Sequence, residues 1–395
     1  MKKQQLPEGW QMVRFGDIAK HISKRVEPTE TDLEVYVGLE HLDPDSLKIK
    51  RHGVPSDVAG QKLFVKKGQI IFGKRRAYQR KVAVSDWDCI CSAHAMVIEA
   101  NSERVVPEFL PFFMQSDIFM KRAVSISEGS LSPTIKWKTL ENQNFLIPSI
   151  NEQRKLVDVM ASRVRTIDCI DKSLESAKAS MRAMLQDVVC AKSTEKSIKE
   201  SLPDGWILKK LKDVVSYRLG RAFPSADYGS EGIKLVRPGN LYASGKVEWS
   251  DTDTTYIPMS YKDENPDYVV YQNEIIMNLT AQSLDDGFLG RVCWTSEGEV
   301  CMLNQRLARL SPRDGVVGRY LFWALQSRLC REYLHRMPLG TKVKHLYNFE
   351  LENIPLLIPE SKEKQLQISK SLDLLAESIE TLQMKKQELR KVSVF

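Results

Sequence analysis

Long hydrophobic runs are absent from this sequence: no stretch approaches the roughly 18 apolar residues that a membrane-spanning helix needs. The N-terminal MKKQQLPEGW has two lysines but no apolar segment behind them, so we expect no secretory signal. The seven cysteines include no CxxC pair, and Cys89 and Cys91 have no further Cys or His at zinc-finger spacing. These absences predict a cytoplasmic protein with reduced thiols, no metal site and no membrane attachment.

Catalytic motifs are missing as well. There is no GxxxxGK(S/T) phosphate loop and no GxSxG, and the six histidines form no HxxxH or HExxH pair. The segment from Asn265 to Tyr268 resembles the (D/N)PP(Y/F/W) signature of N6-adenine methyltransferases, but Asp267 stands where the second proline belongs. No glycine-rich methyl-donor loop precedes it. We therefore expect no catalytic residues and no cofactor in this chain.

The totals favour a large globular protein with a polyanionic partner. A chain of 395 residues exceeds the size at which one core stops growing, so two or more domains are expected. The formal net charge is +7 and the isoelectric point is about 8.9. Such a balance is compatible with nucleic-acid binding, although many basic proteins bind none.

A stretch near the middle, from about 151 to 192, contains neither proline nor glycine. Its apolar residues recur at alternating steps of three and four, which predicts a long helix with a coiled-coil seam. A second, shorter stretch with the same spacing begins near Glu360 and runs to the C-terminus. The seam positions in the two stretches are Met160, Ile167, Ile170, Leu174, Met181 and Val188, and Ile368, Leu372, Leu375, Ile379, Leu382 and Leu389.

The chain is also duplicated. The opening Leu-Pro-Glu-Gly-Trp at 6–10 returns as Leu-Pro-Asp-Gly-Trp at 202–206, and Leu-Glu-Asn-x3-Leu-Ile-Pro at 140–148 returns at 351–359. The first offset is 196 residues and the second is 211, so the second copy carries about 15 additional residues. A period near 200 is too long for a solenoid and indicates a duplicated domain.

Each copy follows one plan: short strands, an amphipathic helix, a Gly-Ser or Gly-Thr loop, the Leu-Ile-Pro segment and the long helix. The strands are expected at 35–39, 69–72, 82–84 and 95–98, and at 234–237, 274–277, 290–294 and 305–310. The amphipathic helices are expected at 107–122 and 318–336.

This plan predicts an α+β fold in which the two long helices bury their seams against each other as an antiparallel coiled coil, with pseudo-two-fold symmetry. The expected domains are 1–150, 151–195, 202–359 and 360–395, with a polar linker near 193–201.

One turn between two expected strands concentrates positive charge. A hairpin tip of this kind can place arginines against phosphates or guanine edges and a tyrosine against bases, although a solvated charged hairpin is an equally good interpretation. Its candidate residues are Lys74, Arg75, Arg76, Tyr78, Arg80 and Lys81. The corresponding turn of the second copy is amide-rich instead, with Gln282 and Ser283 as candidates.

The loops that follow Gly129 and Gly340 carry hydroxyls, lysines and backbone N–H groups near a glycine, which suits phosphate contacts. Their candidate residues are Ser130, Lys136 and Lys138 in the first copy, and Thr341, Lys342 and Lys344 in the second.

Taken together, the Gly-Trp openings, the GKRRAYQRKVAV segment at 73–84, SAHAMVI at 92–98, and Leu-Ile-Pro followed by a glutamate and a long helix resemble the specificity subunits of type I restriction–modification systems. One departure is that Glu152-Gln153 of the first copy becomes Glu363-Lys364-Gln365 in the second. The resemblance implies two target-recognition domains that read the halves of a split site in double-stranded DNA. It also implies helices that bind two methyltransferase subunits, and restriction subunits through them, with S-adenosylmethionine, ATP and Mg²⁺ held by those partners.

Two other functions remain open at this point. The first is a non-enzymatic, two-headed coiled-coil scaffold whose basic loops contact protein or RNA. The second is a specificity subunit of a system that contains a methyltransferase only.

Overall fold

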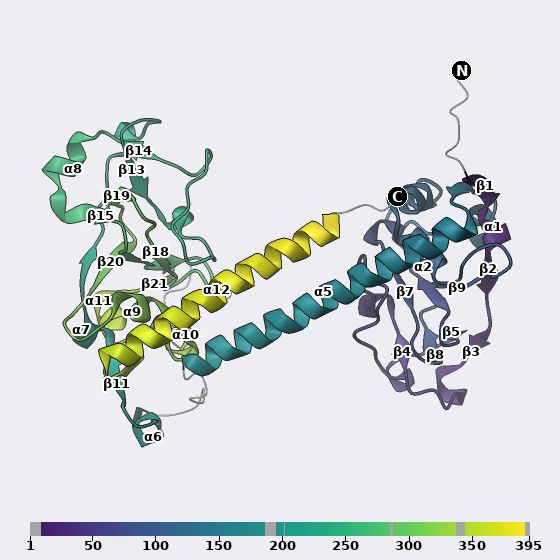
Figure 1. Ribbon diagram of the computed structural model, residues 1–395, viewed down its shortest axis with the longest axis horizontal. Helices are drawn as coiled ribbons and strands as arrows, with labels where there is room; N and C mark the ends of the chain where they lie inside the picture. The colour runs from purple at the N-terminus through teal and green to yellow at the C-terminus, as the bar shows by residue number, and fades with distance from the viewer. Residues whose placement is uncertain (1–8, 186–194, 201, 285–286, 337–343, 392–395) are drawn as a thin grey trace. The chain divides into compact units, whose positions relative to one another are not determined.

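A computed structural model describes residues 9–185, 195–200, 202–284, 287–336 and 344–391 of the chain. The chain divides into two compact units, one formed by residues 1–170 and 385–395 and the other by residues 171–384. Each unit contains one globular domain of short strands and helices (Figure 1). None of the helices that the structure describes combines the length and the hydrophobicity needed to cross a membrane.

The first domain is built from ten strands and four short helices, followed by one long helix. The strands are β1 (Gln11–Arg14), β2 (Ala19–Ile22), β3 (Arg25–Val26), β4 (Tyr36–Val37), β5 (Lys62–Val65), β6 (Ile70–Phe72), β7 (Val82–Val84), β8 (Cys89–Cys91), β9 (Met96–Ala100) and β10 (Asn144–Ile147). The helices are α1 (Phe15–Ile18), α2 (Phe109–Gln115), α3 (Asp117–Ser125), α4 (Trp137–Leu140) and the long α5 (Ile150–Met184).

The second domain follows the same plan with additional elements. Its strands are β11 (Trp206–Lys210), β12 (Val215–Leu219), β13 (Ile233–Val236), β14 (Tyr256–Ile257), β15 (Val269–Tyr271), β16 (Ile275–Asn278), β17 (Thr280–Ala281), β18 (Val292–Trp294), β19 (Val300–Leu303), β20 (Leu307–Pro312), β21 (Lys344–His345) and β22 (Pro355–Pro359). Its helices are α6 (Glu195–Glu200), α7 (Leu211–Val214), α8 (Ser260–Glu264), α9 (Gly318–Ala324), α10 (Arg328–His335), α11 (Asn348–Glu352) and the long α12 (Lys362–Lys391). α6 lies where the sequence suggested only a linker.

Two four-stranded sheets form the centre of each domain. The order β2-β9-β6-β7 of the first domain corresponds to β12-β20-β16-β18 of the second. The other sheets are β3-β5-β8-β4 and β14-β13-β19-β15, and each contains one parallel pair, β4 with β8 and β13 with β19. They differ at one edge, because β3 pairs with β5 whereas β14 pairs with β13. The duplication predicted from the sequence is therefore confirmed in the sheets, apart from this edge.

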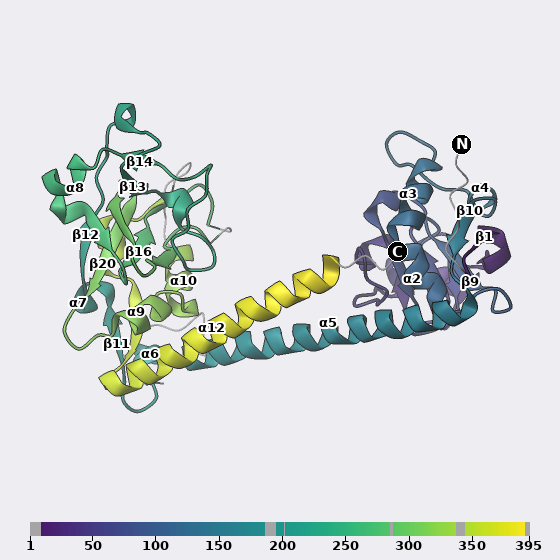
Figure 2. The ribbon, with the colours of Figure 1, turned by 45° about the horizontal axis from the view of Figure 1, so that its top comes forward.

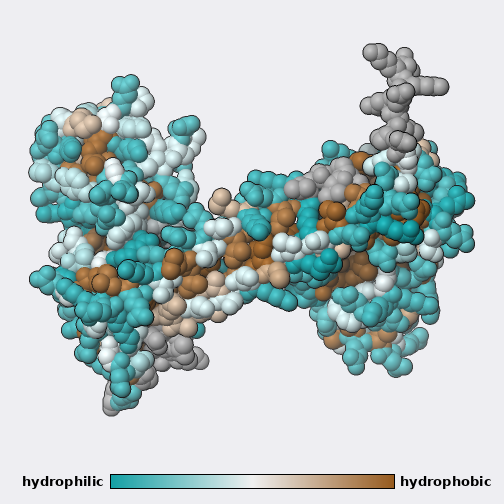
Figure 3. Space-filling model, in the orientation of Figure 1, coloured by the Kyte–Doolittle hydropathy of each residue, from teal (hydrophilic) through white to brown (hydrophobic). Residues whose placement is uncertain are grey.

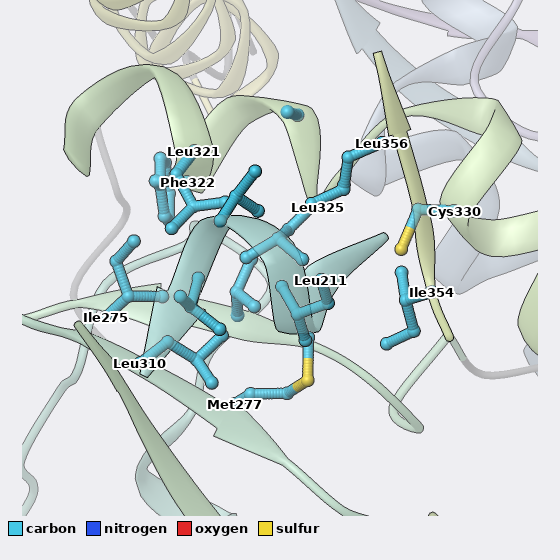
Figure 4. Packing of buried hydrophobic residues seen from close by; sticks show 14 of the residues in the cluster. Leu211, Ile275, Met277, Leu310, Leu321, Phe322, Leu325, Cys330, Ile354 and Leu356 are labelled. Atoms are coloured by element: carbon cyan, nitrogen blue, oxygen red, sulfur yellow. The ribbon is translucent and has the colours of Figure 1, made fainter. Parts of the chain in front are cut away.

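Alternate residues of the central strands face two different cores. In β16, Ile275 and Met277 belong to the large cluster of the second domain, whereas Ile276 belongs to a separate cluster with Val270 and Cys293. Because both faces are covered, such strands are apolar at every position instead of alternating with polar residues. Figure 4 shows the large cluster, in which Ile275, Met277 and Leu310 from the sheet meet Leu321 of α9 and Leu325 just after it.

The single amphipathic helix expected after the sheets is two helices in each domain. Ser116 separates α2 from α3, and its hydroxyl accepts a hydrogen bond from the Phe119 N–H at 3.2 Å. Ser327 separates α9 from α10 and accepts from the Cys330 N–H at 3.4 Å. Serine is a favoured N-cap because its oxygen satisfies an otherwise free N–H of the first turn. The sequence prediction overlooked that this local bond starts a new helix.

The repeated end motifs of each domain meet in space. β1, which follows the first Gly-Trp, pairs antiparallel with β10, which contains the first Leu-Ile-Pro, and Figure 2 shows both strands beside the start of α5. β11 and β22 repeat this pairing. Gly205 has a φ of +73°, and its carbonyl accepts a hydrogen bond from the Glu360 N–H at 3.0 Å, just before α12. The motifs thus connect each globular domain to its long helix.

The first long helix is slightly shorter than expected, and the second is described over residues 362–391. α5 ends at Met184 rather than near Lys192, and α12 contains 30 residues. Val188 lies outside the described residues. Every other predicted seam position is buried or half-buried, and Leu372 is fully buried.

One end of each long helix lies in each unit. The first unit contains α5 up to Ile170 and α12 from Lys385, and the second contains the remaining part of each helix. The start of one helix therefore accompanies the end of the other in both units, which confirms the predicted antiparallel pair. The second core includes Leu372 of α12 and has Met181 and Met184 of α5 packed against it.

Candidate nucleic-acid interface

The basic turn of the first domain, residues 73–81, is joined to the loop that follows Gly129. Arg75 and Thr134 form an isolated antiparallel bridge. On either side of it, the Arg76 N–H donates to the Pro133 carbonyl at 2.7 Å and the Ile135 N–H donates to the Lys74 carbonyl at 3.1 Å. Two segments that are far apart in the sequence thus form one surface.

Two of the expected DNA-contacting cations make contacts within the domain. Arg80 lies in the left-handed region, with a φ of +55°, and its guanidinium pairs with Asp45 at 2.6 Å and with Asp117 at 3.0 Å. Lys81 donates to the Leu39 carbonyl at 2.6 Å. Both side chains therefore hold the turn against the rest of the domain, a role that the sequence pattern did not indicate.

Three other side chains of this turn remain available to a partner. Arg75 Nη1 lies 3.4 Å from the His94 Nε2, and Arg76 donates to the Ser132 hydroxyl at 3.2 Å. The Tyr78 side chain is 54% exposed although it is large and mostly apolar. An arginine supported by a neighbouring side chain and an exposed aromatic ring are both suited to contacting nucleic acid.

The electrostatics of this surface are positive. Burial lowers the pKa of His94, and the nearby charges of Arg75, Lys74 and Lys62 lower that pKa further. Partial burial and, secondarily, the charge of Arg25 lower the pKa of Lys74. The contributions of these neighbouring cations indicate a positive potential, which attracts an anion such as a phosphate.

The remaining candidates of the first domain lie along the glycine loop. Ser130 and Lys138 are exposed, and Lys136 is exposed while pairing with Glu128 at 2.7 Å. The Glu128 and Thr134 backbones also bond to each other in both directions, at 2.9 and 2.8 Å, which closes the loop.

The second domain pairs the corresponding two loops, and we call this pairing of a turn with a glycine loop the joint of each domain. β17 pairs with β21, which places Thr280 opposite His345 as Arg75 is placed opposite Thr134. Gln282 is exposed, whereas Ser283 and Lys344 are half-buried. Thr341 and Lys342 lie outside the described residues. The amide-rich turn and the second glycine loop are therefore joined like their counterparts.

Three equivalent positions meet at each joint. They lie on the turn after β6 or β16, on the turn before β9 or β20, and on the glycine loop. The first domain has Arg75, His94 and Thr134 there, and the second has Thr280, Arg306 and His345. The same three residue types occupy the positions in permuted order.

The permutation changes which groups can reach a partner. Arg306 is exposed in the left-handed region, with a φ of +70°, whereas Thr280 is buried. Burial lowers the pKa of His345, and the charge of Arg306 lowers it further. The arginine of each domain therefore lies beside that domain's histidine, but it projects from a different segment.

The two surfaces also differ at the start of the short helix that follows the joint. Lys136 precedes α4 and Lys138 lies within it, whereas Tyr347 and Phe349 take these places at α11. Tyr347 is 65% exposed and Phe349 is 73% exposed. The first domain therefore presents charge where the second presents aromatic rings.

The methyltransferase-like tetrapeptide has structural contacts. Asp267 pairs with Arg218 at 3.1 Å, and Asn265 accepts a hydrogen bond from Arg221. Both side chains thus tie the turn before β15 to the strand β12 and its following loop. Within the described part of the chain, no group of His, Cys, Asp and Glu side chains is arranged to hold a metal ion.

Sequence analysis alone missed His94, Arg306, Tyr347 and Phe349. Each is a single residue outside the basic turn and the glycine loops, so no local cluster of similar residues marks it as a candidate. Aligning the two copies by strand register would have paired His94 with Arg306, because β6 and β9 pair in the same register as β16 and β20.

Comparison with known proteins gives the same result for both domains. The sequence profile of the type I restriction modification DNA specificity domain matches residues 7–179 and again residues 203–391. The specificity subunit of the type I restriction enzyme MjaVIII from Methanocaldococcus jannaschii is 22% identical over 385 residues, which cover 94% of this chain and 88% of that protein. The EcoDI specificity subunit from Escherichia coli is 24% identical over 186 residues, covering 47% of this chain and 41% of that protein.

Solved structures share the fold over almost the whole chain. The S subunit of a type I restriction–modification system from M. genitalium has a TM-score of 0.60 at 12% identity and covers 98% of this chain and 95% of its own. A chain from a study of complex assembly and conformational transition of the type I system has a TM-score of 0.56 at 21% identity, with 98% and 96% covered. With two profile matches that together span most of its length, this chain belongs to the family of type I restriction–modification specificity subunits, the subunits that recognise the DNA sequence.

Proposed function

We propose that each domain reads one half of a split DNA site with the three segments that meet at its joint. The first domain uses Arg75, Arg76 and Tyr78, with His94 supporting Arg75. The second uses Arg306 and Gln282, with Tyr347, whose ring centroid lies 4.7 Å from that of His345. The observation that carries this proposal is the repeated joint between two loops, at which one arginine in each domain is close enough to a histidine to lower its pKa.

The chemistry of these groups suits base reading. An arginine can donate two hydrogen bonds to the O6 and N7 of guanine, and glutamine can pair with adenine in the same two-pronged manner. Because the arginine projects from different segments in the two domains, the two half-sites should differ in sequence. Lysines such as Lys136 and Lys138 would contact phosphates, which position the protein without selecting bases.

We further propose that α12 binds a methyltransferase subunit through a second apolar face. Leu366, Leu374 and Met384 are exposed, and at 100° per residue they project within about 80° of one another, away from the buried Leu372. Figure 3 shows apolar surface along the long helices. Exposed apolar patches on a helix commonly mark a protein–protein interface.

The division of labour follows from these two surfaces. This chain would place the partner subunits on the DNA and catalyse no reaction itself. S-adenosylmethionine would be bound by the methyltransferase subunits, and ATP and Mg²⁺ by restriction subunits that join through them.

A titration tests the proposal directly. The chain, copurified with its methyltransferase subunits, is added to fluorescent duplexes that carry the site identified by methylation mapping of the host genome. We expect sequence-specific binding that weakens steeply with salt, because phosphate contacts release counterions. Failure to bind or methylate any duplex would instead favour a scaffold that contacts protein or RNA.

A domain exchange provides the second arm. Replacing residues 1–150 with the corresponding domain of a relative should change one half-site and leave the other intact. A change in both half-sites would contradict independent reading by the two domains.

A further inference from the structure

A buried glutamine fastens each long helix to its globular domain. The Gln153 side chain is fully buried, and its Oε1 accepts a hydrogen bond from the Val106 N–H at 2.9 Å. Its Nε2 donates to the Pro148 carbonyl at 2.9 Å. One side chain of α5 thus links the end of β10 and the segment before α2.

Gln365 makes the same contacts in the second domain. It is 1% exposed, its Oε1 accepts from the Val317 N–H at 2.8 Å, and its Nε2 donates to the carbonyls of Pro359 and Gly315 at 2.9 and 3.0 Å. Although the Glu363-Lys364-Gln365 segment differs in sequence from Glu152-Gln153, its glutamine makes the same contacts.

The helix register explains why the motifs differ while the contacts do not. Counted from Ser149 and Ser361, which precede α5 and α12, both glutamines occupy the fourth helical position. Between Leu-Ile-Pro and the glutamine the second copy has one additional residue, Glu360, which lies before the serine and therefore outside the helix.

A second attachment point lies fifteen residues further along each helix. In the first unit Lys48 pairs with Asp168 of α5, and in the second unit Lys246 pairs with Glu380 of α12 at 3.0 Å. A helix rises 1.5 Å per residue, so each lysine contacts its helix about 22 Å beyond the glutamine.

The two lysines are equivalent by backbone hydrogen bonding. The residue before Lys48 accepts a bond from the last N–H of β7, Val84, at 2.9 Å. The residue before Lys246 accepts one from the last N–H of β18, Trp294, at 2.8 Å. The duplication therefore preserves both the buried and the exposed attachment, in addition to the fold.

We propose that each glutamine, together with its lysine–carboxylate pair, forms a helix bracket that fixes the direction in which the domain projects from its helix. Together with the length of the helices, this direction sets the number of base pairs between the two half-sites. This inference rests on the proposed reading of a split site. Two points about 22 Å apart define a direction, and one base pair rotates the duplex by about 34°, so a small change of direction alters the preferred spacing.

The test measures spacing preference in the complete complex. The chain with its methyltransferase subunits methylates duplexes that carry both half-sites at the native spacing and at one base pair more or less. Gln153→Met and Gln365→Met keep the shape of the side chain but remove its hydrogen bonds. In the double variant we expect the preference for the native spacing to fall about tenfold, equivalent to about 1.4 kcal/mol, while the bases read in each half-site stay the same.

The exposed pair permits a rescue experiment. Lys48→Glu should lower the spacing preference by about threefold, as expected for an exposed ion pair. Asp168→Lys in the same chain should restore it. The matched control is Gln383→Met, which changes an exposed glutamine of α12 and should have no effect.

The outcomes separate the two proposals. Unchanged spacing preference in the double glutamine variant, with methylation intact, would overturn the bracket and leave the proposed function standing. Loss of the native preference together with altered bases in either half-site would also overturn it, because the bracket acts on direction only. If the unaltered complex shows no requirement for two half-sites, the proposed function itself is wrong.

Discussion

The guanidinium of Arg75 lies 3.4 Å from the imidazole Nε2 of His94, at the surface where two distant loops of the first domain are joined. A neutral imidazole nitrogen can accept a hydrogen bond, and the pKa of His94 is lowered by burial and by the cations around it. The histidine therefore orients Arg75 without adding a second full charge beside it.

Substitution of Arg75 by alanine should relax one half-site. Loss of a two-pronged contact to guanine costs about 1–3 kcal/mol of discrimination at one base pair. Binding to duplexes substituted at each position of both half-sites would measure this. Relaxation in the second half-site would contradict the assignment. As a comparison, Lys138→Ala should weaken binding to all duplexes alike and reduce the slope of affinity against salt by about one.

Arg306 allows the same experiment in the second domain, with a substitution that does not strain the backbone. Its backbone φ of +70° suits glycine, so Arg306→Gly should leave the unfolding free energy unchanged or raise it slightly. We expect the second half-site alone to lose discrimination. Thermal unfolding and a methylation assay on altered half-sites provide the two measurements, and a large loss of stability would show that Arg306 has an additional structural contact.

Three partly desolvated histidines make stability depend on pH. Burial is the main cause that lowers the pKa of His21, His94 and His345 below the ordinary 6.5. As the pH falls below about 6.5, the unfolded chain therefore takes up protons before the folded chain does. The stability that depends on these neutral histidines is fully present above that pH and is lost as the pH falls through their lowered pKa values. Urea unfolding at pH 7.5 and 5.5 measures the loss, which should shrink in a His21→Gln, His94→Gln variant.

The stabilisation contributed by each serine that divides a helix pair should be measurable by a single substitution. Ser116→Ala or Ser327→Ala removes the cap of α3 or α10 and should cost about 1 kcal/mol of unfolding free energy each. Ser125→Ala, at the exposed end of α3, is the control and should cost less than about 0.5 kcal/mol. Equal effects at Ser116 and Ser125 would argue against the cap.

The long helices should act as a ruler. A seven-residue insertion in both α5 and α12 preserves the seam, which repeats every seven residues, and adds about 10.5 Å. That length corresponds to about three base pairs at 3.4 Å each. Methylation mapping should show a longer spacer between unchanged half-sites, and an unchanged spacer would refute the ruler.

Sequence analysis predicted the elements whose signal is local or periodic. The strand at Val82–Val84 was located to the residue, because its flanking turn and apolar run are distinctive. The long helices followed from their spacing and the duplication from its offsets. The break at Ser116 was missed because one hydrogen bond, not composition, ends one helix and begins the next.

Long-range pairing was beyond such patterns. Whether Arg80 faces solvent depends on Asp45, which is 35 residues away and becomes its neighbour only after folding. Lys48 and Asp168 are separated by 120 residues. Charge in a turn indicates only that a cation is present, whereas the strand register decides which carboxylate it meets.

Glu360 shows how the second copy accommodates one additional residue between its Leu-Ile-Pro segment and its long helix. The insertion precedes Ser361, and every position counted from that serine, including Gln365 and Glu380, keeps the register of the first copy. A recombination event that joined a foreign domain anywhere upstream of Ser149 or Ser361 would therefore preserve the phase of the following helix. If partner subunits bind the helices as proposed, a domain exchanged at either serine would keep that binding surface in place.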